Sequence, residues 1–306
     1  MIKHLLSGFP LSIRKPAVKP GKEMERIDLV ILAATPGEIA PLATFLAPVN
    51  SVSGAGRRTE SSGPAQARLP ALRNQLLIYI YKDIAIAVAT TGIGKVNAAA
   101  VTAALLSGFE AGLVLNVGCA GAYEESGLAI GDVLIVDNCI CADEGILEKE
   151  GPIPTSSLGI PLVIKKGRSF YDCFPLDEFL AGRRIRDLLP TGAYGSAPSG
   201  NVRKGRPFKV QYGPSLTVGM TSGDIETARA RFRGFGALAE NMEASAIAQT
   251  CVLFDTPFLE IRGISNMAGV RDKAQWNIGA AIENCCVLVK CLLDKGCRTE
   301  AGGPEN

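Results

Sequence analysis

The chain has 306 residues, of which 47% are hydrophobic and 20% are charged, and its formal net charge at pH 7 is +2. This composition is typical of a globular chain with room for one large α/β domain or two small ones. A net charge this small argues against nucleic acid as a partner, and apolar runs shorter than ~18 residues argue against a membrane span. The N-terminal residues lack the continuous apolar region of a signal peptide, so we expect a cytoplasmic protein.

The histidine and cysteine content narrows the possible chemistry. There is one histidine, His4, and there are nine cysteines, mostly in apolar runs and with no C-x-x-C pair. Reduced core cysteines are therefore expected, and a metal site is not. A serine or cysteine nucleophile activated by a core histidine is excluded, so acid–base chemistry must come from carboxylates, lysine, tyrosine or cysteine.

Predicted strands and helices alternate along the chain between two segments that resemble flexible tails, 1–25 and 296–306. Runs of apolar residues predict the strands and helical spacing of apolar residues predicts the helices. In chain order we expect a strand at 27–34, a helix at 38–45, a hairpin of 76–81 and 84–90, a helix at 96–106, strands at 113–117 and 133–140, helices at 183–189 and 224–232, a strand at 216–220, a helix from 242, a strand at 258–264 and a helix at 277–294. This alternation indicates a single α/β sandwich over residues 26–295.

Three further segments do not show a regular pattern. Residues 50–70 and 191–208 are rich in Gly, Ser and Arg and are predicted to be loops, and 142–175 reads as an irregular excursion.

Two glycine-rich turns follow predicted buried strands, Thr91–Lys95 and Gly118–Gly121. Neither has the spacing of a phosphate-binding P-loop or of a dinucleotide fingerprint. The glycines serve either close packing of strand and helix or close approach of the backbone to a small ligand, and the sequence leaves both open.

Carboxylates stand at three predicted junctions of strand and helix: Glu38, Asp224 and Glu243. Each is either a helix-capping acid or a functional group, and for Asp224 we favour the cap. Glu38 follows a buried strand through a tight Pro-Gly turn and could act as a general base towards water. Glu240 and Glu243 are predicted to share the first turn of the helical run 240–248, close in sequence to the polar end of the strand at 258–264. Such places usually carry active sites in α/β folds.

Six segments occur in the order seen in the methylthioadenosine/adenosylhomocysteine nucleosidases of the nucleoside phosphorylase superfamily, and the resemblance covers about residues 26–295. They are Ala33–Glu38, Thr91–Ala98, Asn116–Gly121, Gly131–Val133, Asn241–Ala246 and Arg262–Asn266. A narrower likeness to the futalosine hydrolases lies in Cys141–Gly145, Glu150–Pro152 and Ile264–Asp272 with Trp276. The resemblance implies a three-layer α/β/α sandwich around a mixed twisted sheet.

The resemblance also implies roles for individual residues. Glu38 matches the carboxylate that activates water, and Arg262 matches a residue that helps to hold the water, unless it only supports the strand end as a salt bridge. Glu243 matches the acid that binds the ribose hydroxyls, with Met242 beneath the sugar. The other substrate-binding positions implied are Ile93, Cys119, Ala120, Gly121 and Ser265.

Asn266 departs from the adenosine-type nucleosidases, which have an aspartate at this position. An amide can both donate to the 6-keto oxygen and accept from a ring N–H of hypoxanthine. Since a site built on specific hydrogen bonds rejects a ligand that leaves them unpaired, Asn266 favours 6-oxopurine nucleosides. A structural asparagine that caps the turn after the strand is the alternative.

Other positions also depart from the family pattern. Glu226 stands where relatives carry an aromatic that stacks on the base, so stacking is expected from Tyr123, from an aromatic in 170–174, or from none. Cys119 replaces a serine and is expected to line the pocket rather than to act as a nucleophile. Futalosine carries a benzoate-bearing chain at the 5′ end of its sugar, and Arg271 and Lys273 are candidates to bind the carboxylate of that chain.

The activity implied is hydrolysis of futalosine to hypoxanthine and dehypoxanthine futalosine, a step of the alternative menaquinone pathway. It implies no metal or organic cofactor, a small nucleoside as partner, and a homo-oligomer. A phosphorylase, an adenosine-type nucleosidase and a non-catalytic nucleoside-binding protein remain as alternatives.

Overall fold

The computed structural model describes residues 25–48, 76–149, 151–177, 179–180, 183–194 and 207–296. The loop predicted at 50–70 and most of that at 191–208 lie outside these ranges, as do nearly all residues of the two predicted tails. The tail boundaries shift slightly, because Glu25 already belongs to the first strand and the last helix extends to Gly296.

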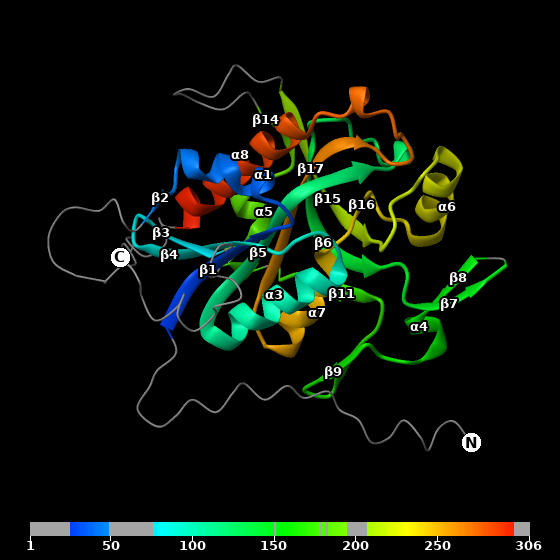
Figure 1. Cartoon of the computed structure of the whole chain (residues 1–306), viewed down its shortest axis with the longest axis horizontal. Helices are drawn as coiled ribbons and strands as arrows, with labels where there is room; N and C mark the ends of the chain where they lie inside the picture. Colours follow the sequence, from blue (N-terminus) through cyan, green and yellow to red (C-terminus); the bar gives the residue numbers. More distant parts are fainter. Residues whose placement is uncertain are drawn as a thin grey trace, which may run out of the picture.

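A mixed sheet forms the centre of the molecule (Figure 1). Strand β1 (Glu25–Ala33) lies parallel between β4 (Ile84–Thr90) and β5 (Phe109–Ala122). On the far side of β5, β17 (Phe258–Met267) runs parallel to β5 and antiparallel to β6 (Val133–Cys141). The sheet continues through β15 (Phe208–Thr217) and β16 (Ala239–Asn241), and its remaining strands are β2 (Ala47–Pro48), β3 (Leu76–Tyr81), β11 (Cys173–Pro175) and β14 (Gly192–Tyr194).

Helices cover both faces of this sheet, so the predicted three-layer sandwich is confirmed (Figure 1). Helices α3 (Lys95–Gly108) and α7 (Ala244–Leu253) pack on one face; α5 (Ile185–Leu188) and α8 (Ile278–Gly296) pack on the other. In β1, Val30 and Leu32 join the core beneath α3 and α7, whereas Leu29 and Ile31 join the core beneath α8. This alternation is why a strand buried on both faces reads as a continuous apolar run.

Helix α8 is a core helix, although the segment Lys273–Lys295 is long and apolar enough by composition to cross a membrane. Leu288, Val289 and Leu292 are buried in the core on its sheet-facing side. Gly263 of β17 lies directly beneath it, where a Cβ would collide with the carbonyl of Ala281. The absence of a side chain therefore allows helix and strand to pack closely.

The structure corrects several predicted boundaries. The strand expected at 216–220 is β15, which ends at Thr217, and the strand at 113–117 is the middle of the much longer β5. The helix expected at 38–45 is one turn, α1 (Pro36–Ile39), followed by a 3-10 segment, η2 (Ala40–Thr44). Pro41 has no N–H to continue an α-helix, which explains the break. The hairpin of β3 and β4 is confirmed.

The excursion at 142–175 contains short hairpins: β7 (Gly145–Glu148) with β8 (Gly151–Pro154), and β9 (Val163–Lys165) with β10 (Arg168–Phe170). Helix α6 (Ile225–Phe235) begins at Asp224, whose side chain accepts a hydrogen bond from the Thr227 N–H, as predicted for a cap. The remaining short elements are η5 (Glu124–Ser126), α4 (Thr155–Leu158), β12 (Phe179–Leu180), β13 (Arg183–Arg184) and η6 (Lys273–Gln275).

Candidate active site

Four elements bring Glu38, Cys119, Arg262 and Glu243 together at one end of the sheet. Glu38 follows β1, Cys119 belongs to β5, Arg262 belongs to β17, and Glu243 is the residue at which α7 begins. The carboxyl ends of parallel strands meet at one sheet edge, so residues far apart in the sequence become neighbours here.

Glu38 both takes part in the capping box at the start of α1 and faces the site. Its Oε2 accepts hydrogen bonds from the backbone N–H (2.8 Å) and hydroxyl (3.0 Å) of Thr35. Its Oε1 accepts from the backbone N–H of Cys119 at 3.0 Å, across 81 residues of sequence. The capping and the functional interpretations of Glu38 are therefore compatible, because each uses a different oxygen.

The glycine-rich segment Gly118–Gly121, predicted to be a turn, is the end of strand β5, and Gly118 shows why glycine stands there. A Cβ on Gly118 would lie 2.6 Å from Glu38 Oε1 and 2.7 Å from Arg262 Nη1. Such distances are too short for any side chain, so the carboxylate and the guanidinium converge over bare backbone. Here the glycine admits two charged side chains.

Arg262 is 1% exposed and lies at the centre of the cluster. Its Nε donates to Glu260 Oε1 at 2.6 Å, and its Nη2 is buried with no hydrogen-bond partner among the described residues. The nearby carboxylates of Glu260, Glu243 and Glu38 raise the pKa of the guanidinium further above its ordinary value, although burial opposes this. Arg262 is thus a permanent cation with a donor still available, and the predicted salt-bridge role coexists with one at the site.

Glu243 is buried at the start of α7 and bonded to the first glycine-rich turn. Its Oε1 accepts from the Gly94 N–H at 2.9 Å, and its Oε2 accepts from the Met242 N–H at 3.3 Å. Gly94 has φ 94°, a conformation that favours glycine and turns its N–H towards the carboxylate. Burial raises the pKa of Glu243, whereas Arg262 lowers it. Each oxygen keeps capacity for a further donor.

Asn266 and Ser265 lie at the end of β17, beside the glycine-rich end of β5. Asn266 pairs in register with Gly121; its Nδ2 donates to the Met267 carbonyl and its Oδ1 accepts from the Ser265 hydroxyl at 2.8 Å. Ser265 also reaches the Ala120 carbonyl at 3.3 Å. The Asn266 amide retains one N–H and part of its acceptor capacity, so its assignment to the purine stays a prediction.

The other predicted positions are placed around this group. Cys119 is half-buried, and burial together with Glu38 raises the pKa of its thiol to about 12, as expected for a residue that lines the site rather than attacks. Met242 is half-buried beside Glu243, whereas Ile93 is 59% exposed. Arg271 donates to the Thr221 hydroxyl at 3.3 Å and lies over the Trp276 ring.

Two predictions are wrong for a physical reason. Glu240 is no helix cap: it is a strand residue of β16, 4% exposed, and it accepts hydrogen bonds from Ser222, Tyr123 and Arg231. The two acids therefore do not share one helical turn, because the chain leaves the sheet between them. Tyr123 is fully buried with its hydroxyl on Glu240, which leaves no ring face for a base.

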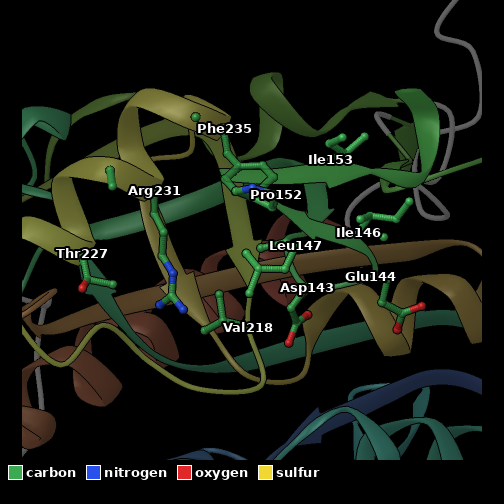
Figure 2. Close-up of a pocket in the computed structure, with 14 residues that line it drawn as sticks. Asp143, Glu144, Ile146, Leu147, Pro152, Ile153, Val218, Thr227, Arg231 and Phe235 are labelled. Carbon is green, nitrogen blue, oxygen red and sulfur yellow. The ribbon is translucent and has the colours of Figure 1, made fainter. Parts of the chain in front are cut away.

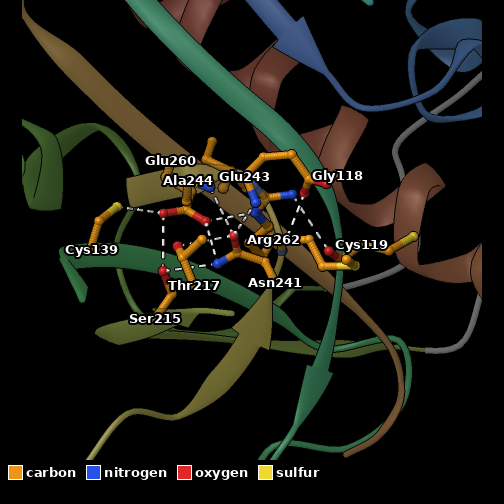
Figure 3. A network of polar contacts seen from close by, with 12 residues as sticks. Gly118, Cys119, Cys139, Ser215, Thr217, Asn241, Glu243, Ala244, Glu260 and Arg262 are labelled. Atoms are coloured by element: carbon orange, nitrogen blue, oxygen red, sulfur yellow. Dashed lines mark hydrogen bonds and ion pairs between the residues drawn. The ribbon is translucent and has the colours of Figure 1, made fainter. Parts of the chain in front are cut away.

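Sequence reasoning missed Glu260 and Asn241, which connect Arg262 to the start of α7 (Figure 3). Glu260 is 0% exposed in the middle of β17. The signal was available, since a carboxylate inside an otherwise apolar buried strand needs a partner. Arg262, two residues later on the same face of the strand, is that partner.

A separate hollow of about 400 Å³ lies between the β7–β8 hairpin and α6 (Figure 2). Apolar side chains such as Leu147 and Phe235 line it together with Asp143 and Arg231. Lys95, next to Gly94, forms an ion pair with Asp143 at 2.7 Å and so joins the rim of the hollow to the turn that holds Glu243. None of the clustered carboxylates lines the hollow itself.

Within the described part of the chain, no group of three or more His, Cys, Asp or Glu residues could hold a metal ion. The charged side chains that the structure brings together at this end of the sheet are the carboxylates of Glu38, Glu243 and Glu260 and the guanidinium of Arg262.

Comparison with known proteins identifies the family of the chain. The family model described as Phosphorylase superfamily matches residues 28–294. A futalosine hydrolase from Thermus thermophilus is 36% identical over 203 residues, which cover 66% of this chain and 79% of that protein. A 5'-methylthioadenosine/S-adenosylhomocysteine nucleosidase from Staphylococcus aureus is 31% identical, covering 68% and 79%.

Solved structures show the same fold. A 5'-methylthioadenosine/S-adenosylhomocysteine nucleosidase from Neisseria meningitidis, in complex with methylthio-immucillin-A, covers 88% of this chain and 99% of its own, with a TM-score of 0.60 and 22% identity. The nucleosidase from S. pneumoniae with a transition-state inhibitor covers 87% and 98%, with a TM-score of 0.61 and 22% identity. From the family match over residues 28–294 and the identity to relatives that it covers to 79%, the chain belongs to the phosphorylase superfamily.

Proposed function

We propose that this protein hydrolyses the N-glycosidic bond of futalosine and releases hypoxanthine and dehypoxanthine futalosine. This activity would place the enzyme in menaquinone biosynthesis by the futalosine pathway. The proposal has two supports: the similarity to the futalosine hydrolase of Thermus thermophilus and the arrangement of charges at the site.

The observation that carries the chemistry is the convergence of Glu38 and Arg262 over Gly118, with Glu243 close to the same guanidinium. Departure of a purine develops positive charge on the ribose. Carboxylates near the sugar stabilise that charge more than they stabilise the neutral substrate, which is the condition for faster reaction.

In the proposed reaction, water attacks the anomeric carbon and the bond from this carbon to the purine nitrogen breaks. The bonding electron pair leaves with the purine. Glu38 accepts a proton from the water and later releases it to solvent, and the departing purine nitrogen takes up a proton from solvent, so that one water molecule is consumed. The free Nη2 donor of Arg262 orients the water, which is where a buried, unpaired N–H is of use.

Glu243 is assigned to the sugar. Its oxygens are held by the Gly94 and Met242 N–H groups and can still accept from two ribose hydroxyls. Met242 lies next to it in sequence and would pack beneath the sugar ring. Ile93 and the end of β5, Cys119–Gly121, complete the proposed walls of the site.

Asn266 is assigned to the leaving purine, and this assignment separates futalosine from adenine nucleosides. The adenosine-type alternative is favoured by the relative from Staphylococcus aureus, which is 31% identical. An asparagine cannot protonate the base as an aspartic acid can, but it can donate to a 6-keto oxygen. We therefore retain futalosine as the substrate.

A phosphorylase is disfavoured by the charge of the site. Glu38, Glu243 and Glu260 surround the single guanidinium of Arg262, so the local charge of this group is negative. A phosphate anion at this place would be repelled by the uncompensated carboxylates.

The protein is further proposed to be cytoplasmic and homo-oligomeric. Large apolar side chains are exposed, including Val96 (83%) next to Lys95 and Leu147 (84%) on the β7–β8 hairpin. Exposed apolar groups of this size favour burial against another subunit.

The test is a purine-release assay with futalosine, inosine and methylthioadenosine, each with and without phosphate. We expect phosphate-independent release of hypoxanthine, fastest from futalosine. Faster release of adenine from methylthioadenosine would show that the interpretation of Asn266 is wrong, and a requirement for phosphate would indicate a phosphorylase.

A further inference from the structure

Glu260 is the most deeply buried carboxylate near the site, and it touches neither the anomeric region nor solvent. Its Oε1 accepts from Arg262 Nε at 2.6 Å and from Asn241 Nδ2 at 3.4 Å. Its Oε2 accepts from Cys139 Sγ at 2.8 Å and from the Ser215 hydroxyl at 3.1 Å. A buried charge with four donors is held in one orientation.

One arm of this network leads to the water-activating side of the site. The bond to Glu260 fixes the Nε edge of the Arg262 guanidinium, which is planar and rigid. Fixing that edge places Nη1 over Gly118, opposite Glu38 Oε1, and leaves Nη2 available. The direction of the free donor is therefore set by Glu260.

The other arm leads to the sugar-binding side. Asn241 donates to Glu260, and its Oδ1 accepts from the backbone N–H groups of Glu243 (3.0 Å) and Ala244 (2.9 Å). Asn241 thus caps the start of α7, the point from which the Glu243 side chain projects. Thr217 also donates to the same Oδ1, at 3.3 Å.

We propose that Glu260 is a positioning residue that orients both halves of the site at once, Arg262 directly and Glu243 through Asn241. It also offsets the positive charge of Arg262, with which it forms an ion pair. The proposal rests on the proposed hydrolase function and adds a residue that does not touch the substrate.

The charge argument has a definite sign. The charged and titratable groups that face Arg262 are Glu260 on its own strand, Glu38 from α1, Glu243 at the start of α7, Cys119 from β5, Cys139 from β6 and Cys285 from α8. Burial raises the pKa of Glu243, and Arg262 lowers it. Removing the negative charge of Glu260 leaves the guanidinium less compensated, so the pKa of Glu243 should fall.

The decisive variant is Glu260→Gln, which keeps the shape of the side chain and removes its charge. We expect kcat for hypoxanthine release to fall by roughly tenfold to 100-fold, since the site is misplaced, with a smaller change in KM. The acid limb of the kcat/KM profile, to which the ionisation of Glu243 contributes, should move to lower pH. A purely structural role would lower the melting temperature without moving this limb.

Two further variants isolate the charge. In the double variant Asn241→Asp, Glu260→Gln, carboxylate and amide exchange places across their hydrogen bond, so the charge returns to the network and a carboxylate still caps α7. We expect the limb to move back towards its wild-type position. Glu240→Gln removes another buried, arginine-paired carboxylate, but that one bonds to Arg231, so the limb should not move.

The outcomes separate this proposal from the proposed function. If wild-type protein releases no hypoxanthine, the proposed function fails. If the wild type is active and Glu260→Gln folds with unchanged kcat and an unmoved limb, the role of Glu260 is refuted. Should Glu260→Gln not fold, Ser215→Ala replaces it: losing one donor to Oε2 should lower kcat without moving the limb, and an unchanged kcat overturns the proposal.

Discussion

Two arginines of this protein form ion pairs with buried carboxylates, Arg231 with Glu240 and Arg262 with Glu260, and the pairs differ in which hydrogen-bond donors are left unpaired. Arg231 and Glu240 are 3.0 Å apart; Glu240 accepts from several donors, and Arg231 also donates to the Met220 carbonyl. Arg262 and Glu260 are 2.6 Å apart, but the guanidinium keeps a buried Nη2 without a partner.

The difference separates structural charge from charge at a site. In the first pair the donors and acceptors are directed at each other and at the loop before α6, as expected for a group that stabilises the fold. In the second pair an unpaired donor remains in a place where it would otherwise be costly, beside two more carboxylates. A buried donor without a partner is tolerated where it serves a function.

The largest effect is expected for Glu38→Gln. This change keeps the side chain's size but removes the proposed base, so kcat/KM should fall about 1000-fold, as for loss of a general base. Steady-state purine release measures it, and a thermal melt checks the fold. A variant with full turnover would remove Glu38 from the mechanism.

A smaller loss, about 100-fold in kcat/KM, is expected for Gly118→Ala, because an added methyl group must displace both Glu38 and Arg262. Gly234→Ala is the matched control, since nothing lies within 4 Å of a Cβ there and its residue belongs to α6. Equal activity of the two variants would contradict the convergence over Gly118.

Asn266→Asp should change selectivity more than rate. A carboxylate no longer donates to a 6-keto oxygen, so the ratio of kcat/KM for futalosine over methylthioadenosine should fall by at least about tenfold. Asn277→Asp makes the same chemical change at the start of α8, where Oδ1 accepts from the Ala280 N–H, and should leave the ratio unaltered. An unchanged ratio in Asn266→Asp would assign specificity elsewhere.

The smallest effect on catalysis is expected for Arg231→Met, which breaks the other pair. It leaves Glu240 buried with fewer donors, so we expect a loss of about 2 kcal/mol in the free energy of unfolding, measured by denaturant titration. Its kcat/KM should change less than in any variant above. A catalytic loss as large as that of Glu38→Gln would mean that the two pairs act as one network.

Much of the architecture could be predicted from local patterns. The β3–β4 hairpin, the Asp224 cap and the alternating layers follow from apolar periodicity and turn chemistry, which act over a few residues. The end of the first helix was misplaced, since Pro41 converts it to a 3-10 segment. The prediction that Glu240 lies in the first turn of a helix is wrong, because Glu240 belongs to β16, a strand that forms only by pairing with β15 and β5.

The sequence narrowed the kind of chemistry: with one histidine, near the N-terminus, the acid–base groups had to be carboxylates, lysine, tyrosine or cysteine, and the resemblance carried by six short segments indicated particular carboxylates. Tertiary structure alone decided how they meet. Glu38 contacts Cys119 across 81 residues, and Glu243 contacts Gly94 across 149, through parallel strands whose pairing no local pattern fixes. The same long-range pairing places Glu260 behind Arg262 and Asn241, and so turns an apparent core residue into the centre of the site's support.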